Sequence, residues 1–222
     1  MAALKGAFLN FGAGLLGALP NIIVFQFNPV QVSRTPSIGQ PPPLVPDESG
    51  QTDAREQAAL PGETMSFSLR VDATDQLAQG NPLAAVNGIL PTLCALELLL
   101  MPKSSLTLDL GKALGLSSSS GQPYQCASNK LPTVLFFWGM FRILPVVITS
   151  LSITETEYDT LLNPTRAEVS VNLQVLVPSQ TKGDALATGA YNYSQGVKEV
   201  MAALNLANAA QLGVSSILSF AG

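Results

Sequence analysis

The chain has 222 residues, a length that suits one domain or one domain with an appendage. Charged residues make up 12%, about half the usual ~25%, which is a thin charged coat for a free soluble monomer. There is no histidine, which excludes a Ser-His-Asp triad, a Cys-His pair and a histidine-ligated zinc site. The net charge of −4 argues against general nucleic-acid binding. We therefore expect much of the surface to contact either a bilayer or other protein subunits.

Two apolar runs could in principle insert in a membrane. Residues 6–19 resemble the apolar core of a signal peptide behind Lys5, but Asn10 lies within the run and Pro20 follows it. The run is also shorter than the ~20 apolar residues of a spanning helix. Polar and helix-breaking residues interrupt the second run, 83–101: Asn87, Gly88, Pro91 and Glu97. We expect both runs to be buried in protein rather than inserted in lipid.

The two cysteines, Cys94 and Cys126, cannot make a disulfide-rich scaffold, although they could make one bridge. The pattern favours two separate thiols, because Cys94 lies in an apolar run that is typical of a buried helix.

The first half of the chain predicts short strands around one long loop. Residues 22–27 are a short β-rich run, and residues 30–34 alternate after Asn28-Pro29. Residues 35–63 contain six prolines and three glycines, which predicts a long irregular loop with polyproline character. Residues 64–71 alternate cleanly, which predicts a half-buried antiparallel strand. Its inward-facing side chains would be Met65, Phe67, Leu69 and Val71.

Two helical segments follow. Asn81 is a predicted N-cap with Pro82 at the first helical position, and this helix should end near Gly88. A second helical stretch is predicted from Pro91 to Met101, where Pro102 stops it. Residues 115–123 have the composition of a flexible linker.

The second half carries the clearest strand patterns. Residues 132–139 form a continuous apolar strand, and residues 147–154 alternate, with Val147, Thr149, Leu151 and Ile153 on one face. Residues 167–175 alternate again, with Asn163-Pro164 as the turn signal between the two strands. This predicts a long β-hairpin with one apolar and one polar face. Residues 184–222 predict a helix with an apolar stripe: Val197, Val200, Met201 and Leu204.

Candidate chemical sites are few. Glu155, Glu157 and Asp159 alternate along one strand and could hold a divalent metal or act as an acid/base cluster. The favoured interpretation is a solvated sheet edge that merges into a turn. Ser117 to Ser120 have no base nearby. Neither a dinucleotide-binding glycine motif nor a P-loop is present. The aromatic residues around 136–141, including Trp138, are assigned to the core or a subunit contact rather than to a stacking platform.

We predict no catalytic, cofactor-binding or metal-binding residues, no cofactor and no enzyme activity.

The order of the segments is more specific than any one of them. FQFNP at 25–29 is followed by VSRT, a proline-rich loop, MSFSLRVDATD, NPLAAVNGILPTLCALELLLMP, PTVLFFWG, VVITSLSITETEYD and NPTRAEVSVNLQVL. This order resembles the tube-initiator or tube-adaptor proteins of contractile injection systems, which lie in the baseplate of phage-tail-like particles between the spike trimer and the inner tube. The match runs from about Ile22 to Val177. Relatives often carry a LysM module, whereas residues 178–222 hold no recognisable LysM.

The patterns and the resemblance together predict an α+β fold, mainly β: a tube-protein-like antiparallel β-barrel or sandwich with a packed helix and an apolar C-terminal helical segment. The predicted organisation is an apolar segment at 1–21, a β domain at 22–177 that includes loop 35–63, and a helical extension at 178–222.

The resemblance further implies a homo-hexameric ring that templates tube polymerisation. Its partners would be the spike trimer, the inner tube protein or a second tube initiator, and other baseplate subunits, with no nucleic acid and no direct membrane insertion. Assembly would be cytoplasmic, within a phage-tail-like particle. Strand segments are expected to carry the subunit contacts, and loop 35–63 to reach a neighbour; the segments are 65–71, 134–138, 147–155 and 167–175.

Two alternatives remain. One is a small membrane-associated or exported protein anchored through residues 6–25 and the C-terminal helix. The other is a hydrolase that uses the acidic strand.

Overall fold

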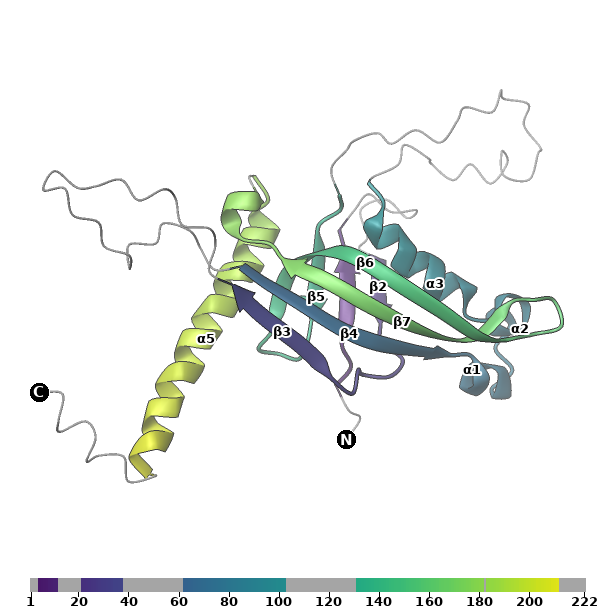
Figure 1. Ribbon diagram of the computed structural model, residues 1–222, viewed down its shortest axis with the longest axis horizontal. Coiled ribbons are helices and arrows are strands. Elements are labelled where there is room, and N and C mark those ends of the chain that lie inside the picture. The colour runs from purple at the N-terminus through teal and green to yellow at the C-terminus, as the bar shows by residue number, and fades with distance from the viewer. Residues whose placement is uncertain (1–3, 12–20, 38–61, 103–130, 182, 212–222) are drawn as a thin grey trace, which may run out of the picture.

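The computed structural model describes residues 4–11, 21–37, 62–102, 131–181 and 183–211, with side chains up to residue 206. Within them, seven strands form one antiparallel sheet and four α-helices accompany it, so the fold is α+β and mainly β, as the sequence predicts (Figure 1). The strands lie in the order β2-β1-β5-β6-β7-β4-β3. The sheet therefore begins and ends with the open edges of β2 and β3.

The strands differ greatly in length. The shorter ones are β1 (Ala7–Asn10), β2 (Asn21–Val24), β3 (Val32–Ser37) and β5 (Val134–Phe137). The longer ones are β4 (Gly62–Asp72), β6 (Ile143–Tyr158) and β7 (Pro164–Val175). The helices are α1 (Thr74–Ala78), α2 (Pro82–Asn87), α3 (Leu90–Glu97) and α5 (Ala185–Gln211), with 3-10 turns at Leu98–Leu100 and Pro178–Gln180.

Strand β1 was not predicted, although residues 6–11 are indeed buried in protein for the most part. It pairs with β2 on one side and β5 on the other, and Phe8 is fully buried. Four residues are too few to show a period of two. Residues 12–20 lie outside the described part of the chain.

The predicted loop 35–63 is too long at both ends. Strand β3 continues through Ser37 and β4 begins at Gly62, and Pro36 pairs with Glu63 in the ladder. A proline is tolerated here because β3 is an edge strand, which pairs with β4 on one side only. Residues 38–61 lie outside the described residues.

The hairpin of β6 and β7 confirms the predicted long hairpin, with one correction to its faces. In β7 the predicted apolar face, residues 167–175, is buried. In β6 a register shift between Ile148 and Ser150 moves the pattern by one residue. Ile148 is therefore buried, whereas Leu151 and Ile153 take the inward face only beyond the bulge.

Phenylalanines from distant strands meet at the centre of the core. Phe8 of β1 and Phe67 of β4 have ring centroids 6.3 Å apart, although three strands separate β1 from β4 in the sheet. Phe136 of β5 stacks on Phe67 at 5.4 Å, and Phe25 meets Phe8 edge-on at 5.2 Å. The sheet therefore curls strongly and brings its two halves face to face, as in a barrel.

Two side-chain amides in the FQFNP segment hold the curled sheet together. The Gln26 amide accepts a hydrogen bond from the Asp72 backbone N–H (2.8 Å) and donates one to the Asp72 carbonyl oxygen (2.6 Å). The pairing of β3 with β4 ends at Phe67, so Gln26 takes the place of a missing strand. The Asn28 amide bonds the backbone of the segment before β1 in the same way. It accepts a hydrogen bond from the Gly6 N–H (2.9 Å) and donates one to the Leu4 carbonyl oxygen (2.8 Å).

The short helices follow the predicted caps. The Asn81 side chain accepts from Leu83 N–H at 3.0 Å, and α2 stops at Gly88, whose φ is +57°. At Gly88 a Cβ would lie 2.1 Å from the carbonyl oxygen of Pro164, so only glycine allows this contact. Cys94 on α3 is exposed, which corrects the expectation of a buried thiol, because the buried stripe of α3 falls on Leu93 and Leu96. Cys126 and the predicted linker 115–123 lie outside the described residues.

Helix α5 confirms the predicted C-terminal helix over residues 185–211; residues 212–222 are outside the described part. Its first half packs on β6 and the β5–β6 turn. Ser194 Oγ donates to the Ile143 carbonyl (2.6 Å), and the Tyr193 hydroxyl donates to the Met140 carbonyl (2.8 Å). Its second half projects away from the sheet (Figure 1).

The one-sided packing of β7 leads to a test. Val171 is 1% exposed, whereas the neighbouring Asn172 is exposed and donates to Ser150 Oγ at 2.9 Å. We expect Val171→Asp to lower the free energy of unfolding by about 3–5 kcal/mol, because it leaves an unpaired charge in the core. Asn172→Asp should change it by about 0.5 kcal/mol or less. Denaturant titration of both variants is the measurement, and equal losses would contradict the assigned faces.

Candidate functional site

The acidic strand is engaged within its own hairpin. Glu157 pairs with Arg166 across the hairpin, and Tyr158 hydrogen-bonds to Glu155, which raises the pKa of this tyrosine. The Asp159 carboxylate accepts from the Leu161 and Asn163 N–H groups at 2.7 and 2.8 Å. In the described part of the chain, acidic residues and cysteines form no group that could hold a metal ion. Glu155 and Glu157 are exposed at the end of β6, and Asp159 holds the turn that follows.

Asp72, at the end of β4, accepts four hydrogen bonds from three residues. It is 6% exposed. Its Oδ1 accepts from the backbone N–H and the hydroxyl of Thr74, at 2.9 and 2.5 Å. Its Oδ2 accepts from Arg166 Nε at 2.8 Å and Arg70 Nη2 at 3.2 Å. Asp72 thus joins α1, β4 and β7, next to the backbone that Gln26 holds.

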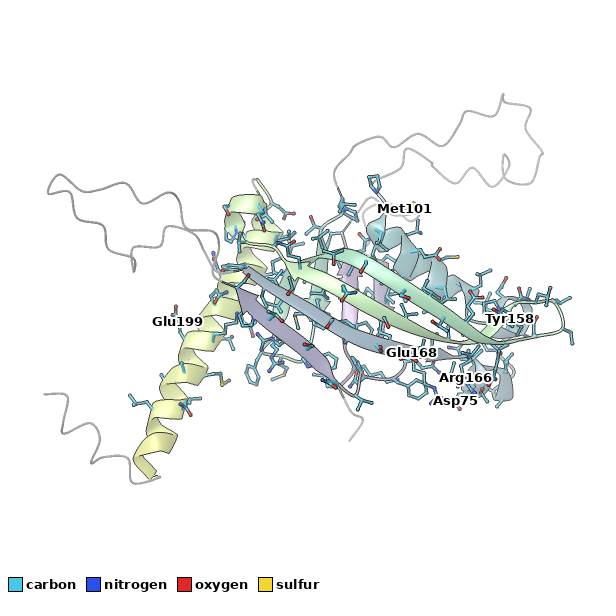
Figure 2. The ribbon with its side chains drawn as sticks, in the orientation of Figure 1. Asp75, Met101, Tyr158, Arg166, Glu168 and Glu199 are labelled. Atoms are coloured by element: carbon cyan, nitrogen blue, oxygen red, sulfur yellow. The ribbon has the colours of Figure 1, made fainter. Side chains whose placement is uncertain are left out.

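These bonds keep Asp72 ionised. The Thr74 hydroxyl bond lowers its pKa most, burial opposes it, and the Thr74 N–H and the two guanidinium groups lower the pKa further. The result is a pKa well below the ordinary range of an aspartate. The same contact raises the pKa of Arg166. Figure 2 shows Arg166 near Asp75 and Tyr158, at the end of the molecule opposite Glu199 of α5.

A second buried carboxylate ties α5 to the sheet edge. Glu63 of β4 is buried and accepts from Arg34 Nε of β3 at 2.5 Å and from Lys198 Nζ of α5 at 3.4 Å. Burial alone would raise the pKa of Glu63, but the bonds and charges of Arg34 and Lys198 together lower it. Lys198 thus joins the middle of α5 to β4.

The outer face of the long strands is a surface of hydroxyls and amides. Two rows run across β4, β7 and β6, and their members are opposite one another in the ladder: Ser66, Asn172 and Ser150 in one row, and Ser68, Ser170 and Ser152 in the other. Ser68 and Ser170 are 3.3 Å apart through their Oγ atoms. The next row pairs Arg70 with Glu168, so charges are balanced there.

A groove of about 990 Å³ lies over part of this face. Its walls are β4, β7 and residues 27–31 of the loop before β3. Phe27 of that loop lies under Arg70, whose guanidinium carbon is 5.7 Å from the ring centroid. The groove is open, and its charged lining residues are Arg70, Arg166 and Glu168.

The predicted aromatic cluster separates into core and surface. Phe136 is fully buried and Trp138 packs against the core at 6.0 Å from it, as predicted. Phe141 lies in the β5–β6 turn and is exposed. The strand segments expected to carry contacts are found in β4, β5, β6 and β7.

Many large apolar side chains of the described residues are exposed, and three groups of them are named here. The tip surface joins α2 to the β6–β7 turn: Leu83, Val86, Leu161 and Leu162. The turn surface lies at the β5–β6 turn: Leu4, Met140 and Phe141. The α5 stripe is the predicted one, and only Val197 of it is half-buried: Val197, Val200, Met201 and Leu204. These surfaces are the candidate functional sites.

Sequence reasoning found the α5 stripe by its helical spacing but missed the other two surfaces. Leu161 and Leu162 lie in a turn, where no period identifies a face. The available signal was a pair of leucines inside a turn that is otherwise polar.

Comparison with known proteins adds no relative. No protein-family model matches the chain, and no curated protein matches it. Among the described residues, no helix combines the length and the apolar character needed to cross a membrane.

The Asp72 network predicts a pH-dependent stability. Because folding lowers the pKa of Asp72, its stabilisation is present above about pH 4, where the unfolded carboxyl is ionised, and is lost as the pH falls below that value. We expect Asp72→Asn to lower the free energy of unfolding by about 1–3 kcal/mol at pH 7. The difference in the free energy of unfolding between Asp72→Asn and wild type should be smaller near pH 2 than at pH 7.

Asp75→Asn is the matched control, since Asp75 is an exposed aspartate of α1 three residues away. Denaturant titrations at both pH values measure the effect. A loss that is the same at both pH values, or equal in the two variants, would contradict the assigned role of Asp72.

Proposed function

We propose that the chain is a structural subunit of a contractile injection system. In this proposal it is a ring-forming adaptor of the baseplate that connects the spike to the inner tube and templates tube polymerisation. It acts without catalysis or cofactor, and it assembles in the cytoplasm as part of a phage-tail-like particle.

The segments that carry the resemblance support the proposal through their roles in the fold. FQFNP supplies Gln26 and Asn28, which close the curled sheet. PTVLFFWG contains β5, which pairs with β1 and β6. NPTRAEVSVNLQVL contains β7, which lies between the two other long strands. All three belong to one framework, so their joint occurrence has a structural reason.

The observation that carries the proposal is the presence of three exposed apolar surfaces on one small domain. The tip surface and the turn surface lie at opposite ends of β6, because the two turns flank that strand. The α5 stripe projects from the sheet in another direction (Figure 1). Exposed clusters of this kind mark interaction sites. A single dimer contact covers one patch, whereas a ring stacked between two layers covers several.

The mechanism is templating. In a closed ring each copy uses two different faces for its neighbours, which leaves the upper and lower faces for the spike and the tube. The resemblance implies that the ring contains six copies of the chain. It also implies that the partners are the spike trimer and the inner tube protein. The long hairpin supplies rigidity, since β7 is hydrogen-bonded along its length on both sides.

Assembly with the spike and inner tube proteins of the same particle is the test. We expect the co-produced proteins to give a ring stacked on the spike in electron micrographs. Leu204→Asp should reduce assembly, because it places a carboxylate on the α5 stripe, whereas Asn205→Asp should assemble normally. Both residues are exposed, so neither change should lower the thermal stability of the subunit.

A chain that stays monomeric beside both partners, or that remains in the membrane pellet after carbonate extraction, would contradict the proposal.

A further inference from the structure

The β6–β7 turn is built to hold two leucines in solvent. Leu161 and Leu162 are 72% and 79% exposed. Leu162 has a φ of +64°, a left-handed conformation that is unfavourable for a leucine. The Asp159 carboxylate and the Asn163 side chain hold the turn, and Asn163 Nδ2 also donates to the Val86 carbonyl at 3.0 Å. Strain at a rigid, exposed apolar tip indicates a contact surface.

Helix α2 enlarges this tip. Leu83 and Val86 are three residues apart on α2, so they share one face, and both are exposed. The N–H of Ile89 donates to the Pro164 carbonyl at 2.8 Å, which fixes the end of α2 against the start of β7. Figure 1 shows α2 beside the hairpin turn. The tip surface is therefore one apolar patch on two elements that are bonded together.

The tip end is acidic. Residues 155–166 carry three carboxylates and a single cation, Arg166. The carboxylates are those of Glu155, Glu157 and Asp159. An apolar patch with this surround favours a partner surface that is apolar and basic.

The opposite end of β6, at the β5–β6 turn, is apolar and basic. Met140 and Phe141 are exposed in the β5–β6 turn, which Tyr193 holds through the Met140 carbonyl. Leu4 lies beside this turn, near Gly139. Residues 4–10 and 138–147 carry Lys5 and Arg142 and no acidic residue. Arg142 is exposed next to the apolar pair.

We infer that the tip surface of one copy docks on the turn surface of a second copy, head to tail. Tip against tip would bring carboxylates together, and turn against turn would bring cations together, so the unlike pairing is favoured. The partner is thus a second copy of this chain, chosen by charge as well as by apolar area. The inference deepens the proposed function and rests on it for its setting, because rings close through heterologous contacts of this kind.

The test uses two variants of the full chain, each damaged at one end. The tip variant is Leu161→Ser with Leu162→Asn, since asparagine tolerates a positive φ and leaves the turn intact. The turn variant is Phe141→Ser with Arg142→Glu. The control is Val30→Ser with Leu98→Ser, two exposed apolar residues outside both surfaces. Circular dichroism checks that each variant folds.

Sedimentation velocity over a concentration series then measures association. We expect wild type and control to associate beyond the dimer, and each damaged variant alone to associate about tenfold or more weakly. An equimolar mixture of the two damaged variants should give 1:1 heterodimers and nothing larger, because each retains one intact end. High salt should weaken that heterodimer, since it screens the charges.

Three outcomes would overturn the inference: wild type that stays monomeric, a damaged variant that associates as wild type does, or a mixture that forms no heterodimer. These results are distinguishable from failure of the proposed function. If the head-to-tail contact fails but wild type still stacks on the spike and tube proteins, only the inference is lost. If the heterodimer forms but neither partner binds, the particle assignment is lost and the contact stands.

Discussion

The closure of the curled sheet is the constraint on which the rest of the structure depends. Phe8, Phe67 and Phe136 come together only if the strands wrap around them, yet the sheet ends in two edges that do not pair with each other. The backbone of Asp72 lies beyond the end of β3 and is buried, so its N–H and carbonyl groups need partners. The Gln26 amide supplies both, and the Asp72 carboxylate then anchors Arg166 of β7.

A domain closed in this way leaves its ends uncovered. The core runs along β4 and β7 and includes the start of β6, together with side chains of β1, β5 and α3. The large apolar side chains of the two turns that flank β6 lie outside it and are exposed. Helix α5 covers the sheet only through its first half, up to the Lys198–Glu63 ion pair. The low charge content of the chain agrees with this arrangement, because apolar rather than charged side chains occupy part of the exposed surface. That distribution suits a subunit that is covered by neighbours.

Sequence patterns predicted those parts whose packing follows a regular period. The alternation in β4 and β7 and the Asn81 cap of α2 are local properties, and they appear as expected. The bulge after Ile148 depends on pairing with β7, and the place of Pro36 in a strand depends on β3 being an edge, so neither can be seen in a local pattern. The tip and turn surfaces were missed for a related reason: exposure in a turn is set by tertiary packing.

Residue-resolved hydrogen exchange of the Asp72 amide tests the closure most directly. In wild type this N–H should exchange as slowly as the amides of the β4–β7 ladder, although its partner is a side chain. In Gln26→Ala it should exchange about tenfold or more faster, while Gln31→Ala, a change at an exposed glutamine of the same loop, should leave it protected. An Asp72 amide that exchanges equally in wild type and Gln26→Ala would contradict the account.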